Sequence, residues 1–317
     1  ALTKERWIDA RKVDLLNVGY FHVVFTIPDV LNTVAYHNQR VVYGILFKSV
    51  AETLKELAAN KKYLGADIGF TSILHTWGQN LIHHPHIHCI VPGGGLNSLG
   101  KWVNSRRKFF IPVRVLSRLF RGKFLYHLKQ AHLNEQLKFF GDEQYLLDVI
   151  AFNNFLSPVY EKEWVVYCKP PFKNASCVVE YLGRYTHRVA ISNNRIIAFE
   201  NGIVTFKWRD YKDNNRWKTM RLTAEEFIRR FLIHILPDHF MKIRHYGLLG
   251  NRNKTVKLVL CKKLTHTPLM ERLKLSTEEL LLKLTGRDIS VCPQCGLGRM
   301  QKTLNIAKPP PFGFTLA

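Results

Sequence analysis

The sequence predicts an α+β fold with a central antiparallel sheet. Segments of strand length and segments with helical spacing of apolar residues follow one another without the regular strand–helix–strand rhythm of a doubly wound domain. Asn201-Gly202 joins two β-rich runs, and this dipeptide is the strongest short-range signal for an antiparallel hairpin. Hydrophobic residues make up 46% of the 317 residues, which is enough to bury a core and excludes general disorder.

The predicted strands are rich in β-branched and aromatic residues and are bounded by proline, glycine or asparagine. They comprise residues 20–27, 68–77, 86–91, 164–168, 195–200 and 203–208. The predicted helices are residues 39–64, 109–137, 174–187 and 223–236, and the chain beyond residue 251 is expected to be basic and helical. The helix at residue 223 opens with Thr223 and has Glu226 three residues later, which is the pattern of a capping box.

Charge is the clearest compositional signal. Lys and Arg number 47 against 24 Asp and Glu, a formal charge of +23, so we expect a polyanionic partner. Nucleic acid is the first expectation and an anionic membrane surface the second. No apolar run reaches the roughly 18 residues of a membrane span, and the charged start lacks a secretory signal. Six scattered Cys suit a reducing cytoplasm better than a disulfide framework, and a first residue other than Met suggests a trimmed or incomplete chain.

Histidines gather on the segment of residues 83–91. Because side chains alternate along a strand, we expect His86 and His88 to share one face while Ile87 and Ile90 point to the other. If the preceding strand pairs with this one, His75 comes beside them, and three imidazoles leave room for water and substrate on a bound cation. His84 is a competing third ligand. The alternative is a cluster of histidines on a solvated face.

Two tyrosines lie one helical turn apart in the segment of residues 174–187. Tyr181 and Tyr185 share a helical face, and Arg184 and Arg188 form a similar pair on a neighbouring face. A phenol has a pKa near 10, so it attacks a phosphodiester only with help in losing its proton. Such an attack would leave a phosphotyrosine and a free hydroxyl. The alternative is a pair of core aromatics.

Aromatic rings alternate with cations after the predicted hairpin. Cations hold phosphates while rings stack on unpaired bases, so this stretch suits single-stranded nucleic acid. The expected contact residues are Lys207, Trp208, Arg209, Tyr211, Arg216 and Trp217. A second cationic stretch spans residues 101–123. The alternative is a charged face that only meets water.

These motifs together resemble a specific family. The run His86-Ile-His88, preceded by Leu74-His75-Thr-Trp-Gly and followed by Gly93-Gly-Gly, is similar to the histidine motif of the HUH endonucleases. The segment Tyr181-Leu-Gly-Arg-Tyr185 resembles their two-tyrosine branch, the rolling-circle transposases of bacterial insertion sequences. The resemblance covers about residues 6–260, including the segments of residues 21–28, 226–231 and 244–248.

The resemblance implies an HUH-type sheet of about five antiparallel strands and a transposase that cleaves and rejoins single-stranded DNA. Tyr181 and Tyr185 would be the nucleophiles, acting through a 5′-phosphotyrosine. We hypothesise in addition that Arg184 or Arg188 holds the phosphate. His75, His86 and His88 would bind a divalent cation, usually Mg²⁺ or Mn²⁺ in this family, although imidazole ligands alone favour Zn²⁺, Cu²⁺ or Ni²⁺. The DNA partners would be transposon ends and target DNA, in a bacterial cytoplasm near the nucleoid.

Three alternatives share some of these features. A plasmid replication initiator or relaxase would use the same chemistry on a replication origin instead of a transposon end. An inactive transposase-derived protein would bind DNA without a covalent product. A zinc-dependent phosphoesterase would use the histidines with water as the nucleophile and would tolerate loss of both tyrosines.

Two parts are expected along the chain: a catalytic domain over residues 1–222, and a basic helical part over residues 223–317. We expect the N-terminal cysteine-rich zinc domain that members of the family often carry to be absent. Cys292 and Cys295 have the spacing of half a tetrahedral zinc site. They would be a remnant, half of an intermolecular site, or two ordinary thiols.

Overall fold

The computed structural model describes residues 2–106, 110–169, 172, 177–178, 183, 190–211, 213–252, 254–270 and 275–300. Its helices are α1 (Leu2–Lys12), α2 (Asn32–His37), α3 (Gln39–Ala59), α4 (Val113–Leu133), α5 (Val149–Glu161), α7 (Ala224–Leu232), α8 (Lys254–Leu264) and α9 (Thr277–Thr285). Among the described residues, no helix combines the length and apolar character that crossing a membrane requires.

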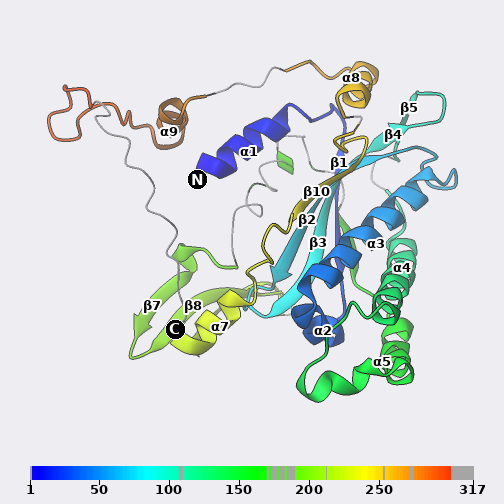
Figure 1. The fold of residues 1–317 in the computed structure, drawn as a ribbon. Helices are drawn as coiled ribbons and strands as arrows, with labels where there is room; N and C mark the ends of the chain where they lie inside the picture. Colours follow the sequence, from blue (N-terminus) through cyan, green and yellow to red (C-terminus); the bar gives the residue numbers. More distant parts are fainter. Residues whose placement is uncertain are drawn as a thin grey trace.

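A central sheet of five strands forms the middle of the molecule (Figure 1). The strand order is β10-β2-β3-β1-β6, and each neighbouring pair is antiparallel. The strands are β1 (Tyr20–Thr26), β2 (Gly69–Trp77), β3 (His83–Pro92), β6 (Val166–Lys169) and β10 (Ile243–Gly247). The predicted α+β fold with a central antiparallel sheet is therefore confirmed. A short hairpin of β4 (Gly94–Leu96) and β5 (Trp102–Asn104) follows β3.

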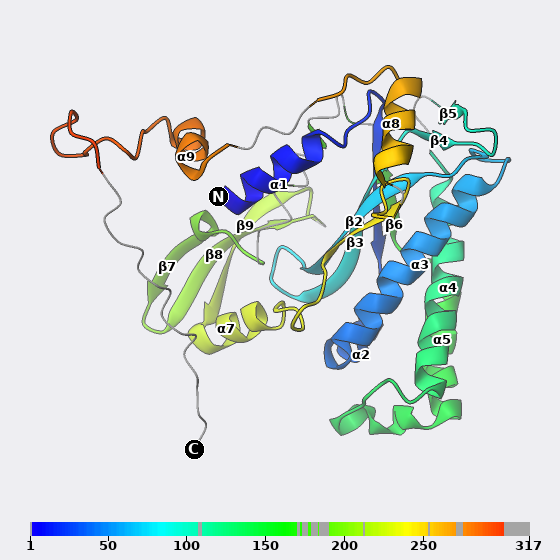
Figure 2. The same cartoon turned by 45° about the horizontal axis from the view of Figure 1, so that its top comes forward.

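One face of this sheet is covered by α3 and α4, with α5 packed beside α4 (Figure 2). Alternate residues of the strands point into this layer, among them Phe25 of β1, which is completely buried. Its ring meets Phe120 of α4 edge to face, with the ring centroids 5.1 Å apart. Phe120 and Phe124 also contact the ring of Trp164. This layer holds the main apolar core.

The opposite face of the sheet carries a smaller apolar cluster made by Tyr20, Ile73, Ile90 and Val178. Helix α1 lies on this side, and its Trp7 packs against the cluster. The prediction that Ile90 points away from His88 was wrong. Residues two apart share a face, so Ile90 lies with the histidines, whereas Ile87 and Cys89 enter the main core.

A second, three-stranded sheet follows the tyrosine segment. Its strands are β7 (Ile196–Glu200), β8 (Ile203–Asp210) and β9 (Arg216–Thr223), all antiparallel. The predicted hairpin is confirmed: Asn201 and Gly202 both have positive φ, at 49° and 73°, as the turn requires. Strand β9 was not predicted because its exposed charged residues give no apolar alternation.

Helix α7 packs against one face of this smaller sheet through Phe227 and Phe231. The Thr223 hydroxyl accepts a hydrogen bond from the backbone N–H of Glu226 at 3.3 Å, as expected of a cap. The Glu226 carboxylate does not return to the cap, because it pairs with Arg229 and Arg230 at 2.6 Å. Only half of the predicted capping box is therefore formed. Helix α7 ends at Leu232, four residues before the predicted end at residue 236.

Strand β10 forms an edge of the central sheet, although it lies beyond residue 223. The sheet therefore draws on both sides of the boundary that we expected at residue 222. Helices α8 and α9 follow; α8 is basic, with four Lys and no acidic residue, whereas α9 has two Glu and one Lys. Helix α3 is shorter than predicted because Asn60 ends it and accepts a hydrogen bond from the N–H of Lys62. Helix α4 begins only after Pro112.

Candidate metal site and DNA-contacting surface

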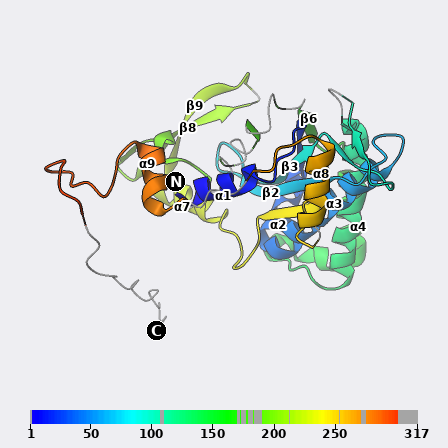
Figure 3. The same ribbon diagram turned by 90° about the horizontal axis from the view of Figure 1, so that it is seen from above.

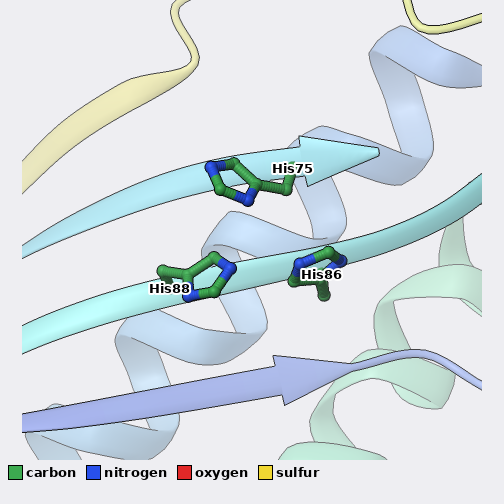
Figure 4. Close-up of side chains that lie close together, drawn as sticks. All are labelled: His75, His86 and His88. Carbon is green, nitrogen blue, oxygen red and sulfur yellow. The ribbon is translucent and has the colours of Figure 1, made fainter. Parts of the chain in front are cut away.

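Three histidines meet on the face of the central sheet opposite α3 and α4. Strands β2 and β3 pair so that His75 lies directly across from His86, and Ile73 lies across from His88. Figure 4 shows the three rings on the same side of the two strands. One ring nitrogen from each residue can be chosen so that the three atoms lie within 4.8 Å of one another. This spacing allows a single cation to contact all three.

The rings of these histidines are close and turned toward one another. The centroid of His75 is 4.4 Å from that of His88 and 5.4 Å from that of His86. Only 2% of the surface of His75 is exposed. Burial lowers the pKa of His86 to about 4 and holds the pKa of His88 well below its usual range, with the neighbouring imidazoles acting in the same direction. The rings of His86 and His88 are therefore neutral near pH 7, the form in which imidazole binds a metal.

A backbone contact sets which nitrogen of His86 is available. Its Nδ1 lies 2.6 Å from the carbonyl oxygen of His84, so Nδ1–H donates and Nε2 keeps its lone pair. Among the described residues, the potential three-ligand group contains His75 and leaves out His84. His84, which the sequence left open as the third ligand, supplies a carbonyl to the ring of His86.

A fourth histidine, His22 of β1, supports His88. Nε2 of His22 and Nδ1 of His88 are 2.8 Å apart, and the two rings are almost parallel. If Nε2 of His88 binds a cation, its Nδ1 carries the proton and donates to His22. Sequence reasoning missed His22. In the pairing of β1 with β3, His22 lies across from Ile90, two residues beyond His88. The position of His22 is therefore informative only once this pairing is known.

The four predicted residues Tyr181, Arg184, Tyr185 and Arg188 lie outside the described residues. Two described neighbours show what the segment packs against. Val178 is fully buried and joins the cluster with Ile73 and Ile90, each two positions from a histidine of the triad. A side chain at Gly183 would collide with Ile8 of α1. The segment therefore contacts the same face of the sheet at Val178 and contacts α1 at Gly183.

The expected DNA-contacting residues lie on β8, β9 and the turn between them. Lys207 and Arg209 are exposed on the face of the small sheet that points away from α7, and Trp217 lies across from Arg209 with 61% of its surface exposed. Tyr211 and Arg216 are exposed near the tip. We name Lys207, Arg209 and Trp217 the outer face of the small sheet.

Trp208 departs from this grouping, because alternation turns it toward α7, where it packs against the cluster that contains Phe206. Lys218 lies 6.0 Å above the ring of Trp208 and forms ion pairs of 2.9 Å with Asp210 and Asp213. The second cationic stretch, residues 101–123, is also separate from the histidines. Its described helical part belongs to α4, on the far side of the central sheet.

The small sheet is tied to the loop that follows the histidine strand β2. The Gln79 side chain donates to the Tyr211 hydroxyl at 3.1 Å. The Arg195 guanidinium donates to the carbonyl oxygens of Gln79 and Lys207. These contacts connect the small sheet to the loop that follows the strand carrying His75.

Comparison with known sequences identifies the family of this chain. Residues 69–256, more than half of the chain, match the family model Y2_Tnp, described as "Putative transposase". The chain is 48% identical over 305 residues to "Putative transposase y4qJ" of Sinorhizobium fredii (strain NBRC 101917 / NGR234), covering 95% of this chain and 77% of the relative. The chain belongs to the Y2 transposase family.

A more distant relative is the "Transposase for insertion sequence element IS801" of Pseudomonas savastanoi pv. phaseolicola. It is 27% identical over 252 residues, which cover 78% of this chain and 58% of the relative. The family expected from the histidine and tyrosine motifs is thus confirmed, as a transposase of the IS801 type.

Two solved structures are also similar. One is titled "Conjugative Relaxase TrwC in complex with mutant OriT Dna", with a TM-score of 0.31 and 11% identity over 78% of this chain and 74% of that chain. The other is TrwC complexed with a 27-mer DNA, with a TM-score of 0.28 and 10% identity over 78% and 75%.

Proposed function

We propose that this transposase cleaves and rejoins single-stranded DNA by tyrosine transesterification assisted by a divalent cation. The observation that carries the proposal is the triad of His75, His86 and His88, three imidazoles that meet on one face of the sheet. The transposase family to which the chain belongs supplies the substrate class, DNA.

The triad fits a metal ion in donor type and spacing, and burial keeps His86 and His88 neutral near pH 7. His86 would bind through Nε2, because its Nδ1–H donates to a carbonyl, and His88 through Nε2 if His22 accepts from its Nδ1. A cation held there would polarise the scissile phosphate and stabilise the charge that develops on it. Resemblance to the HUH family favours Mg²⁺ or Mn²⁺, whereas the imidazole ligands alone favour softer ions.

The nucleophile in this proposal is the phenol oxygen of Tyr181 or Tyr185. A bond forms between that oxygen and phosphorus, and the bond from phosphorus to the 3′ oxygen breaks. The phenol loses its proton and the leaving 3′ oxygen gains one, giving a 5′-phosphotyrosine and a free 3′-hydroxyl. The second tyrosine makes a further cut while the first is occupied. The burial of Val178 in one cluster with Ile73 and Ile90, on the histidine face of the sheet, supports this role, because Tyr181 follows three residues later in the sequence.

The outer face of the small sheet provides a surface for the strand. Lys207 and Arg209 offer charge to phosphates, and the exposed ring of Trp217 offers a stacking surface for an unpaired base. Base contacts of this kind are sequence-tolerant. Arg184 or Arg188 would hold the scissile phosphate.

The direct test is to incubate the protein with labelled single-stranded DNA and Mn²⁺ and to resolve the products on a denaturing gel. We expect a protein-linked DNA band that EDTA abolishes and that the double variant Tyr181→Phe/Tyr185→Phe lacks. The matched control is Tyr126→Phe, an exposed tyrosine on α4, which should leave the band unchanged. Cleavage without a linked band would indicate water as the nucleophile and would overturn the proposal.

A further inference from the structure

The CxxC pair near the end of the described chain lies in an ordered turn. Residues 290–300 fold back on themselves: the N–H of Cys292 donates to the carbonyl of Gly298 at 2.7 Å, and the N–H of Met300 donates to that of Ser290 at 2.6 Å. The N–H of Gly296 donates to the carbonyl of Cys292 at 2.9 Å, closing the turn that carries both cysteines. We name residues 290–300 the cysteine loop.

Backbone amides of the cysteine loop point at sulfur. The N–H of Gly298 donates to Sγ of Cys295 at 3.3 Å. The backbone of Leu297 and the side chain of Cys292 also form hydrogen bonds with this sulfur. A thiolate accepts such hydrogen bonds far better than a thiol does, so the loop is built to hold sulfur as an anion. Thiolate is also the form that binds Zn²⁺.

Two thiolates are half of a structural zinc site, which takes four ligands. Within the described part of the chain, the group of potential ligands that can surround one ion does not include Cys292 or Cys295. Residues 296–317 contain neither Cys nor His. The cysteine loop extends beyond α9, away from the central sheet (Figure 3), and Cys295 is exposed. Ligand atoms of another molecule can therefore reach Cys295 and complete the site.

A second copy of the same chain fits this half-site. Two copies related by a two-fold axis bring two identical cysteine pairs together, which gives four thiolates around one ion. Like-charge repulsion is small at this point of a +23 protein, because residues 276–300 hold three acidic and three basic side chains. Leu297 is 90% exposed beside the cysteines and offers an apolar contact to its counterpart.

We propose that Cys292 and Cys295 from two copies bind one Zn²⁺ and join two transposase chains. Four thiols lose four protons, four Zn–S bonds form, and no group is oxidised or reduced. The zinc ion would join two transposase chains through their cysteine loops. The joined chains could then act on two DNA strands at once. The inference is independent of the nucleophile and of the ion at the histidine triad.

The test uses the full chain, freed of metal by a chelator under reducing conditions and then titrated with Zn²⁺ or Co²⁺. We expect bound zinc to fall by about half an equivalent per chain when Cys292→Ser/Cys295→Ser replaces the wild type. Because both proteins keep the histidine triad, any zinc bound there cancels when the bound zinc of the double variant is subtracted from that of the wild type. Light scattering should show a metal-dependent dimer that EDTA reverses and that the double variant cannot form. Co²⁺ should give the charge-transfer absorption of a thiolate site.

The matched control is Cys177→Ser, which removes another exposed cysteine and should keep both the half equivalent and the dimer. A loss of one full equivalent from a protein that stays monomeric would place the remaining ligands in the same chain and would overturn the proposal. So would a titration with no difference between wild type and the double variant, which would make the cysteines ordinary thiols.

Discussion

The two faces of the central sheet use the same strands for different purposes. On β3, Ile87 and Cys89 point into the apolar layer beneath α3 and α4, while His86 and His88 point to the opposite face. The first face gains stability from burying apolar surface, and the second buries neutral imidazoles whose desolvation opposes protonation. Because side chains alternate along a strand, the apolar residues that stabilise the fold and the histidines of the triad occupy opposite faces of the same sheet.

The largest expected effect is on the histidine face. His86→Ala removes one of three ligands, so we expect Mn²⁺ affinity and DNA cleavage to fall by more than about 100-fold, above the range seen when a supporting residue is lost. Stability should change little. His84→Ala is the matched control, since it keeps the backbone carbonyl that accepts from His86. Isothermal titration with Mn²⁺ and gel cleavage assays measure both; equal activity of the two variants would refute a ligand role for His86.

The opposite face should show the reverse pattern. Phe120→Ala removes a fully buried ring in contact with Phe25 and Trp164, which should lower the free energy of unfolding by about 3–5 kcal/mol. Phe199→Ala, on the exposed edge of β7, is expected to cost less than about 0.5 kcal/mol. Urea denaturation gives both values. If Phe120→Ala instead weakened Mn²⁺ binding in the folded protein, the two faces would not be separable.

His22 sharpens the comparison, because it acts through His88. His22→Phe keeps a ring but removes the acceptor for Nδ1–H of His88, so we expect Mn²⁺ affinity to fall about 10- to 100-fold. His22→Gln, whose amide oxygen can accept, should recover part of the loss. A purely structural role would instead lower stability in His22→Phe and leave the metal affinity of the folded protein unchanged.

Acid should destabilise the metal-free protein through other buried histidines. Burial lowers the pKa of His83, His234 and His245 from 6.5 to about 4. The unfolded chain therefore binds more protons between about pH 6.5 and 4, so stability is lost as the pH falls through that window. Each such proton contributes about 1.4 kcal/mol per pH unit. Urea denaturation in EDTA near pH 7 and near pH 5 measures the slope; a flat profile would contradict it.

The sequence predicts the histidine face well because its signals are local. Alternation groups His86 with His88, and the short connection of residues 78–82 brings His75 beside them by forcing β2 and β3 to pair. The turn at Asn201-Gly202 is equally local, since it needs only two residues with positive φ. These features require no knowledge of the strand order.

What the sequence could not give depends on contacts between distant segments. His22 joins the site only because β1 pairs with β3. The residues of β1 carry no local signal that predicts this pairing. Strand β10 is five residues long and half-buried, so it carries no clear alternation and its place at the sheet edge was missed. Trp208 was grouped with the DNA-contacting residues by composition, but the register of β8 turns it toward α7.

The central claim is that DNA becomes linked to Tyr181 or Tyr185 when a divalent cation is present. The most direct measurement is to react the protein with single-stranded DNA in Mn²⁺, digest both polymers, and locate the nucleotide-bearing peptide by mass spectrometry. We predict a phosphotyrosine at Tyr181 or Tyr185 that is absent in EDTA and in His86→Ala. A linkage at another residue, or one that forms equally without metal, would contradict the account.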